Sequence, residues 1–315
     1  MNALKRVLIW VLVFTAVFVS ISFSYWIGYQ NGRKISKRSE LVSTDNDSLK
    51  EQDKILCERS YYNDKIEESN SNNTVNENVK EYVEIFNKNF NQTAGKVQYG
   101  IHIYQSKIRY TNESYKAPSA SVIKIFIMEY AYSQMENGLI KSDTMIGGKN
   151  LIEMITSMIT VSDNNATNAL IDYFGMDNLN EFFKKQGYND TVLERRMLDT
   201  AAMKNGRDNY TSANDVMQFL DKLYLGKDKY PYKNMLDIMK AQKIATKIRR
   251  RLPANVVIAN KTGELSDVEN DIGIVFTEND DIAFVFLCNS LRNNASVRDA
   301  ISNTTYAVYN KLRQK

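Results

Sequence analysis

The sequence predicts an α+β domain that follows a membrane-spanning helix and a polar stalk. Two strand-like runs stand early in the domain, helical patterns fill its middle, and three strand-like runs come late. An amphipathic helix at each end of this series predicts terminal helices that cover an antiparallel sheet. The terminal helices and the strand-like runs are, in chain order, Glu81–Phe90, Gly100–Tyr104, Ile108–Tyr110, Val256–Lys261, Asp271–Thr277, Ile282–Asn289 and Ala295–Leu312. The helical middle predicts an all-helical subdomain beside the sheet.

Residues 7–27 predict the transmembrane helix. They carry no charge, and both tryptophans, Trp10 and Trp26, lie near the ends of the run, where indole rings prefer the headgroup region. At 1.5 Å per residue the run spans the ~30 Å hydrocarbon core of a bilayer. A cleaved signal peptide is the alternative, but the apolar run exceeds the usual length of roughly 7–15 residues and no Ala-x-Ala site follows. We therefore expect residues 1–32 to form an uncleaved membrane anchor.

Residues 33–78 predict a flexible stalk, because they are rich in Asn, Ser, Glu, Lys and Asp and cannot bury enough surface to offset their ordering entropy. The domain then occupies residues 79–315. Basic residues after the apolar run outnumber those before it, and charge alone predicts a cytoplasmic domain. We expect the opposite, a single-pass protein of the cell membrane with an extracellular catalytic domain, because of the chemistry that the motifs below predict.

Composition excludes several kinds of function. The 315 residues are 43% hydrophobic and 25% charged, and the net charge of +4 is spread without a block of one sign. We therefore expect a folded monomer with no nucleic-acid partner. One histidine and two cysteines, without a CxxC pair, predict no metal and no cofactor. The histidine, His102, lies inside a strand-like run, which argues against a Ser-His-Asp triad.

The first chemical motif is Ser121-Val122-Ile123-Lys124, directly before an apolar helical run. Residues three apart share a helix face, so Lys124 would reach the hydroxyl of Ser121. A lysine in apolar surroundings loses its charge more easily and becomes a base near neutral pH. The alternative interpretation is a helix cap followed by a surface lysine, and the spacing also arises by chance.

Two further motifs follow in the helical middle and in the late strands. Ser162-Asp163-Asn164 stands between two helical runs, where its hydroxyl could relay a proton and its amide could hold a lysine and a substrate carbonyl; ordinary N-cap chemistry is the alternative. Lys261-Thr262-Gly263 stands at the end of a strand-like run and suits a substrate carboxylate, with a glycine that permits close approach; a strand ending in a turn is the alternative. Chance can explain each motif alone, but it explains the occurrence of all three in this order far less well.

With these motifs the sequence resembles the penicillin-recognising serine enzymes, closest to class A β-lactamases, whose motifs are S-x-x-K, S-D-N and K-T-G. The likeness covers about residues 80 to 313 and includes Leu252-Pro253 before the third motif and Asn270-Asp271 after it. It implies a β-lactamase/transpeptidase-like fold. The implied roles are Ser121 as nucleophile, Lys124 as base, Ser162 as proton relay, Lys261 as carboxylate anchor, Asn164, Thr262 and Gly263 as substrate contacts, and the backbone N–H groups of Ser121 and Glu264 as oxyanion hole.

The sequence departs from that family in the loop that follows the second motif. Leu193-Glu194-Arg195 and Arg207-Asp208 resemble the two ends of the family's Ω-loop, whose aspartate pairs with the opening arginine. The family's deacylating glutamate comes two residues after that arginine, and here the position is Met197. The only acid inside the loop is Asp199. Acylation machinery is therefore predicted complete, and fast β-lactam deacylation is doubtful.

Three hypotheses follow for the function. The favoured one is an acyl-transfer enzyme whose Ser121 attacks a β-lactam or the D-alanyl-D-alanine end of a peptidoglycan stem peptide. The second is a penicillin sensor that stays acylated, and the third is a scaffold that has lost catalysis. Intact Ser121, Lys124, Ser162 and Lys261 argue against the third hypothesis.

Overall fold

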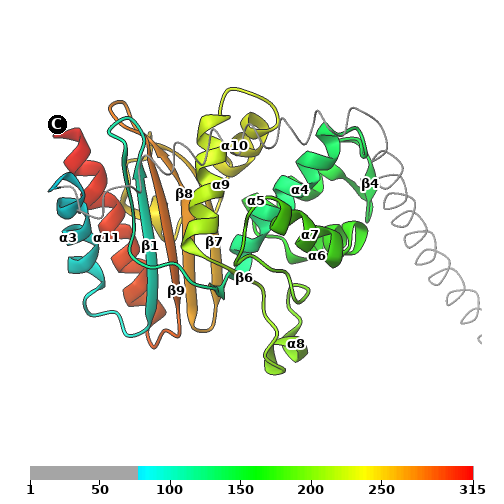
Figure 1. Ribbon diagram of the computed structural model, residues 1–315, viewed down its shortest axis with the longest axis horizontal. Helices are drawn as coiled ribbons and strands as arrows, with labels where there is room; N and C mark the ends of the chain where they lie inside the picture. The colour runs from blue at the N-terminus through cyan, green and yellow to red at the C-terminus, as the bar shows by residue number, and fades with distance from the viewer. Residues whose placement is uncertain (1–76, 315) are drawn as a thin grey trace, which may run out of the picture. The chain divides into compact units, whose positions relative to one another are not determined.

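A computed structural model describes residues 77–314 of the chain (Figure 1). These residues belong to the second of two units into which the chain divides, Glu67–Lys315. The predicted anchor and nearly all of the predicted stalk lie outside the described residues. Within residues 77–314, no helix is both long and apolar enough to cross a membrane.

A five-stranded antiparallel sheet forms the centre of the domain, with the strand order β2-β1-β9-β8-β7. Its strands are β1 (Lys96–Ile103), β2 (Ile108–Thr111), β7 (Val257–Leu265), β8 (Val268–Phe276) and β9 (Ile282–Asn289). The two early and three late strands of the prediction are confirmed. Strand β7, however, continues through the whole third motif to Leu265 instead of ending at Lys261, and Gly263 pairs in register with Asn270 of β8.

The first and last helices cover one face of this sheet, as predicted (Figure 1). They are α3 (Glu77–Phe90) and α11 (Asn294–Arg313). The short 3₁₀ helix η2 (Ile248–Arg251) contributes Ile248 to the same apolar cluster. Tyr82 and Phe86 of α3 pack with Phe284 and Phe286 of β9, and all four side chains are fully buried. This apolar layer fixes the sheet from behind.

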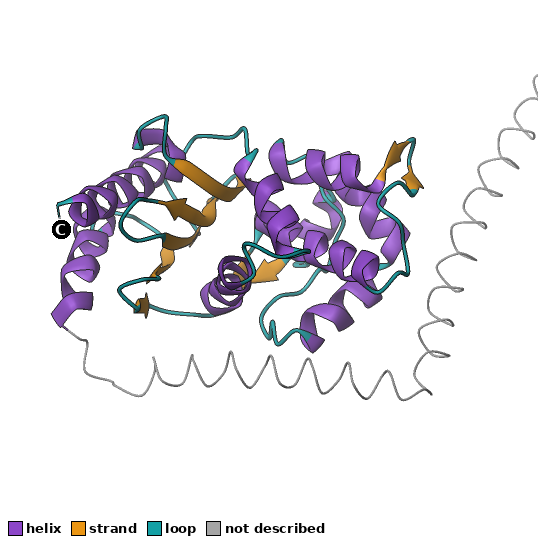
Figure 2. Cartoon of the chain, turned by 90° about the horizontal axis from the view of Figure 1, so that it is seen from above, coloured by secondary structure: helices purple, strands orange, loops and turns teal. Residues whose placement is uncertain are grey.

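Helices α9 and α10 pack toward the other face of the sheet, next to the remaining helices (Figures 1 and 2). This subdomain contains η1 (Ala120–Ile123), α4 (Lys124–Glu136), α5 (Leu151–Thr160), α6 (Asn164–Phe174), α7 (Met176–Lys185), α8 (Thr200–Lys204), α9 (Ala213–Leu225) and α10 (Tyr232–Lys240). Two small two-stranded sheets accompany it, β3 (Ala117–Pro118) with β6 (Tyr210–Thr211) and β4 (Met145–Ile146) with β5 (Lys149–Asn150). The predicted helical subdomain is thus confirmed.

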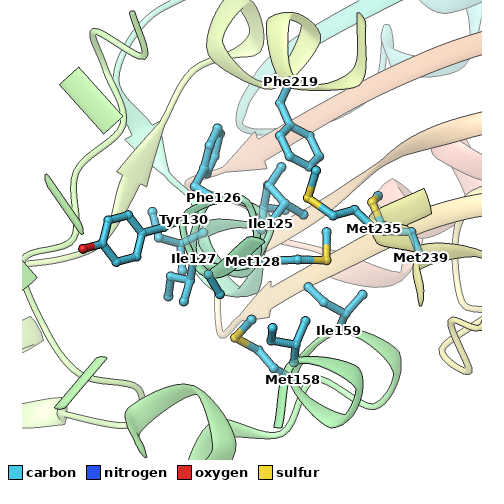
Figure 3. Packing of buried hydrophobic residues seen from close by; sticks show 14 of the residues in the cluster. Ile125, Phe126, Ile127, Met128, Tyr130, Met158, Ile159, Phe219, Met235 and Met239 are labelled. Atoms are coloured by element: carbon cyan, nitrogen blue, oxygen red, sulfur yellow. The ribbon is translucent and has the colours of Figure 1, made fainter. Parts of the chain in front are cut away.

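Helix α4 is the buried centre of the subdomain. Its first residues after Lys124, Ile125–Met128, are all fully buried and point in different directions into the surrounding core (Figure 3). A helix that is apolar on every side must be enclosed by other elements. This enclosure holds the first motif, at the start of α4, in a fixed position.

Candidate active site

Ser121 lies on a tight turn that leads into α4. The turn is the 3₁₀ helix η1, and Ala120 before the serine has a φ of +46°, a left-handed conformation that non-glycine residues rarely adopt. Lys124, three residues after Ser121, begins α4 directly where η1 ends. Among the described residues, the hydroxyl of Ser121 has no hydrogen-bond partner.

The ammonium group of Lys124 instead points to the second motif. It is completely buried, and its Nζ donates to the carbonyl oxygen of Ser162 at 2.8 Å, to Ser162 Oγ at 3.0 Å and to Asn164 Oδ1 at 2.8 Å. Burial lowers the pKa of Lys124 to about 7, against the opposing charge of Asp163. A substantial fraction of Lys124 is therefore neutral near pH 7, as a general base requires.

The second motif serves as a helix cap and as part of the site at once. Asp163 is the N-cap of α6, with its carboxylate accepting from the backbone N–H groups of Asn165 and Ala166. Ser162 has a φ of +58°. Both its carbonyl oxygen and its hydroxyl accept from Lys124. The motif therefore caps a helix, as one interpretation predicted, and the cap fixes the two neighbouring residues that contact Lys124.

Lys261 of β7 reaches the same hydroxyl from the sheet. Its Nζ donates to Ser162 Oγ at 3.0 Å and to the carbonyl oxygen of Thr262 at 2.7 Å. Burial and the nearby charge of Lys124 hold the pKa of Lys261 well below its usual range. The structure thus brings Lys124, Ser162, Asn164 and Lys261 together around one hydroxyl group.

Gly263 allows the third motif to approach the first. A Cβ atom added there would lie 2.9 Å from the carbonyl oxygen of Ser119 and 3.2 Å from the backbone nitrogen of Ser121. Any side chain at this position would push the strand away from the serine turn. The close approach brings β7 next to the backbone of Ser121, and Glu264 is the next residue of that strand.

Asn270 of β8 ties the serine turn to the sheet. It is fully buried, and its Nδ2 donates to the carbonyl oxygens of Pro118 at 2.9 Å and Ser119 at 3.1 Å. Its Oδ1 accepts from the backbone N–H of Cys288 at 3.0 Å. The sequence analysis noted this residue only as part of the resemblance. Its neighbours on β8, Glu269 and Asp271, are polar as well, so no apolar pattern around Asn270 marks its structural role in the sequence.

The loop after the second motif closes as the resemblance implied. Arg195 Nε and Asp208 Oδ1 form an ion pair at 2.7 Å. Met197 is only 7% exposed and packs into the apolar core of the helical subdomain. Asp199 is the N-cap of α8, and its carboxylate accepts from the backbone N–H of Ala202 at 2.9 Å. No acid therefore stands at the position of Met197, and the acid within the loop holds a helix end.

Asn168 of α6 fixes the backbone of Met197 from both sides. Its Oδ1 accepts from the Met197 N–H at 2.7 Å, and its Nδ2 donates to the Met197 carbonyl oxygen at 3.1 Å. The sequence analysis missed this contact, because the partner residues stand far apart in the chain. The contact holds position 197 at a fixed distance from α6, the helix that the second motif caps.

His102 belongs to a different part of the molecule. It lies on β1, separated from β7 by two other strands, and its Nδ1 is 2.7 Å from Asp221 Oδ1. Within residues 77–314, no group of three or more His, Cys, Asp or Glu side chains could hold a metal ion.

Comparison with known proteins connects this geometry to a family. A sequence model described as the Beta-lactamase enzyme family matches residues 80–312, and no curated protein gives a match. The structures of a beta-lactamase from Sphaerobacter thermophilus (21% identity, 74% of this chain and 97% of that one, TM-score 0.65) and one from Chitinophaga pinensis (20%, 73% and 99%, 0.67) share the fold. The structure of PBP-A is equally similar (22%, 74% and 96%, 0.65). The chain belongs to the beta-lactamase enzyme family, within the penicillin-recognising serine hydrolases.

Proposed function

We propose that this protein is a serine hydrolase that β-lactams or D-Ala-D-Ala-like peptides acylate at Ser121. The observation that carries the proposal is the convergence of Lys124, Lys261 and Asn164 around Ser162, beside the turn that carries Ser121. Lys124, with a pKa of about 7, would supply the base. The hydroxyl of Ser162, between Lys124 and Lys261, would supply the proton path, and no histidine is needed. Such a set serves acyl transfer rather than structural support alone.

Acylation would proceed in a balanced sequence of bond changes. Ser121 Oγ attacks the carbonyl carbon of the substrate amide, and neutral Lys124 takes its proton. The carbonyl oxygen becomes negative and accepts from the backbone N–H groups of Ser121 and Glu264. The C–N bond then breaks as Ser162 passes a proton to the leaving nitrogen and regains one from Lys124. The products are an ester at Ser121 and a free amine.

Lys261 and Thr262 are placed to bind the carboxylate of such a substrate. Because Lys261 has a strongly lowered pKa in its buried setting, an arriving carboxylate would restore its charge and gain an ion pair in low dielectric. Asn164 and the backbone around Gly263 would hold the rest of the substrate along the edge strand β7.

Hydrolysis of the ester would be slow, and this favours a second candidate function. Met197 presents an apolar, buried side chain where the family's glutamate activates water. The protein would then act as a peptidase-like enzyme or as a sensor with a long-lived acyl-enzyme. PBP-A, which shares the fold, has a mutant whose structure is an acyl-enzyme complex with penicillin G.

The proposed setting is the outer face of the cell membrane, where peptidoglycan stem peptides and β-lactams occur. Residues 7–27 would anchor the chain, and residues 33–78 would carry the domain away from the bilayer as a monomer. Protease added to intact spheroplasts should release a fragment that begins before Asn78. Protection of the stalk until the membrane is permeabilised would contradict this orientation.

Labelling with a fluorescent penicillin tests the proposed chemistry. Ser121→Ala should abolish the covalent label and leave the circular dichroism spectrum unchanged, because only one half-buried hydroxyl is removed. Ser133→Ala, further along α4, is the matched control and should label like the parent. Persistent labelling of the Ser121→Ala variant would identify another nucleophile.

A further inference from the structure

The carboxylate of Glu264, the residue directly after the third motif, lies between two cationic side chains, Lys247 and Arg298. Glu264 Oε1 accepts from Lys247 Nζ at 2.6 Å and from Thr246 Oγ1 at 3.3 Å. Glu264 Oε2 lies 3.5 Å from Arg298 Nη2. Lys247 is a third lysine near the site, after Lys124 and Lys261, since its charge lowers the pKa of Lys261 and the charge of Glu264 raises it.

Glu264 is the replaceable member of this cluster. Lys247 Nζ also donates to Glu269 at 2.9 Å, and both of these side chains are fully buried. Glu269 in turn accepts from Arg298 Nε at 2.8 Å. The side chain of Glu264 is 40% exposed. Lys247 therefore keeps one buried partner when the Glu264 carboxylate moves away, and the outer side of the cluster becomes free for another anion.

The position of Glu264 on β7 places this cluster next to the substrate. Glu264 directly follows Gly263, which approaches the backbone of Ser121. Side chains alternate along a strand, so Glu264 points to the same side of β7 as Thr262, a predicted substrate contact. Two cations, Lys247 and Arg298, balance two carboxylates, Glu264 and Glu269, so the cluster has no net charge while Glu264 stays in place.

We propose that Glu264 is a specificity-determining residue that competes with the carboxylate of the substrate for Lys247. The inference rests on the proposed function, because it assumes an anionic substrate along β7. The site then binds carboxylate-bearing substrates more weakly than Lys261 and Lys247 would allow without Glu264. A substrate with a neutral group at that end meets no competition. Removing the charge of Glu264 leaves the cluster with one unpaired positive charge and should favour anions selectively.

Equilibrium binding to a chain without its nucleophile tests this inference separately from acylation. The probes are benzylpenicillin and its uncharged methyl ester, and calorimetry gives the affinity of each for the Ser121→Ala chain. Adding Glu264→Gln should strengthen binding of the anion roughly 3- to 10-fold, as one partly exposed charge allows. Binding of the ester should change by less than about twofold, and added salt should reduce the gain for the anion.

Glu181→Gln in the same Ser121→Ala background is the matched control. Glu181 lies on α7 in an exposed pair with Lys185, so the variant has the same net charge without touching the cluster and should bind both probes like its parent. Equal gains for anion and ester, no gain, or no binding of either probe would overturn the role of Glu264. If the native chain is never acylated but the selective gain appears, the proposed function fails and the role of Glu264 stands.

Discussion

The two sides of the Ser121 turn differ in how their polar groups are used. On the side of β7 and α6, Lys124 and Lys261 donate to one serine hydroxyl, and Asn164 accepts from the first lysine. On the other side lies the loop that the Arg195–Asp208 ion pair closes. There the position of the family's deacylating glutamate holds the buried side chain of Met197.

This difference separates the two halves of an acyl-transfer cycle. In the proposed cycle, the polar side would supply the base and the proton path that acylation needs. The loop side would supply no base for deacylation, because position 197 is a methionine whose backbone Asn168 holds, and Asp199 caps a helix. Acylation and deacylation should therefore respond to different substitutions.

Removing the base should have the largest effect. Lys124→Ala should slow acylation by benzylpenicillin roughly 10²–10⁴-fold, the usual contribution of a positioned general base. Lys124→Arg, which keeps a positive charge but cannot become neutral, should be equally impaired. Stopped-flow or gel labelling measures both rates. Near-normal acylation of either variant would remove Lys124 from the role of base.

Supplying the missing acid should act on the loop side alone. Met197→Glu should speed hydrolysis of the acyl-enzyme by about 10²-fold or more, because a carboxylate on the backbone that Asn168 holds can activate water. Met197→Gln has nearly the same size without a base and should remain slow. Acyl-enzyme lifetimes of the three proteins make the comparison. Faster acylation without faster deacylation would show that the loop is aligned incorrectly.

The pH dependence tests the polar side without a mutation. Acylation needs neutral Lys124, whose pKa is about 7, so the rate should be level above that value and fall as the lysine becomes protonated. The fall should approach about tenfold per pH unit in the acidic range. Acylation rates between about pH 5.5 and 8.5 check this. A rate that rises toward acid pH has the wrong sign for a lysine base.

The tie between β8 and the serine turn should have a moderate effect. Asn270→Leu removes the side-chain donor to the carbonyl oxygens of Pro118 and Ser119, although Ser119 still accepts from the backbone N–H of Val122. The loss should lower the free energy of unfolding by about 1–3 kcal/mol and slow acylation by about tenfold through misplacement of Ser121. Thr305→Val removes a buried hydroxyl on α11, and should lower stability while leaving acylation unchanged. Denaturant unfolding and labelling rates separate the two effects. Equal acylation rates for the two variants would show that Asn270 contributes to stability but does not position Ser121.

The smallest effect should come from the acid inside the loop. Asp199→Asn should change neither deacylation nor stability appreciably, because asparagine caps a helix about as well as aspartate. The lifetime of the acyl-enzyme is the measurement. Accumulation of a much longer-lived ester would mean that Asp199 is the deacylating base.

The sequence predicted the elements and the motif residues that lie close together better than the contacts that position them. Local patterns were enough for the strands, for the terminal helices and for the three motifs, because these depend on periodicity and short spacing. The direction of Lys124 toward Ser162 instead of Ser121 depends on the turn at Ala120 and on burial of α4. The contacts of Asn270, Asn168 and Lys247 join segments far apart in the chain, and no local pattern encodes such packing.

Intact mass measured over time after mixing with benzylpenicillin tests the central claim most directly. The account predicts one added penicillin per chain, located on Ser121 by peptide mapping, that persists far longer in the parent than in the Met197→Glu variant. An adduct on another residue, no adduct, or an adduct that the parent hydrolyses as fast as the variant would contradict it.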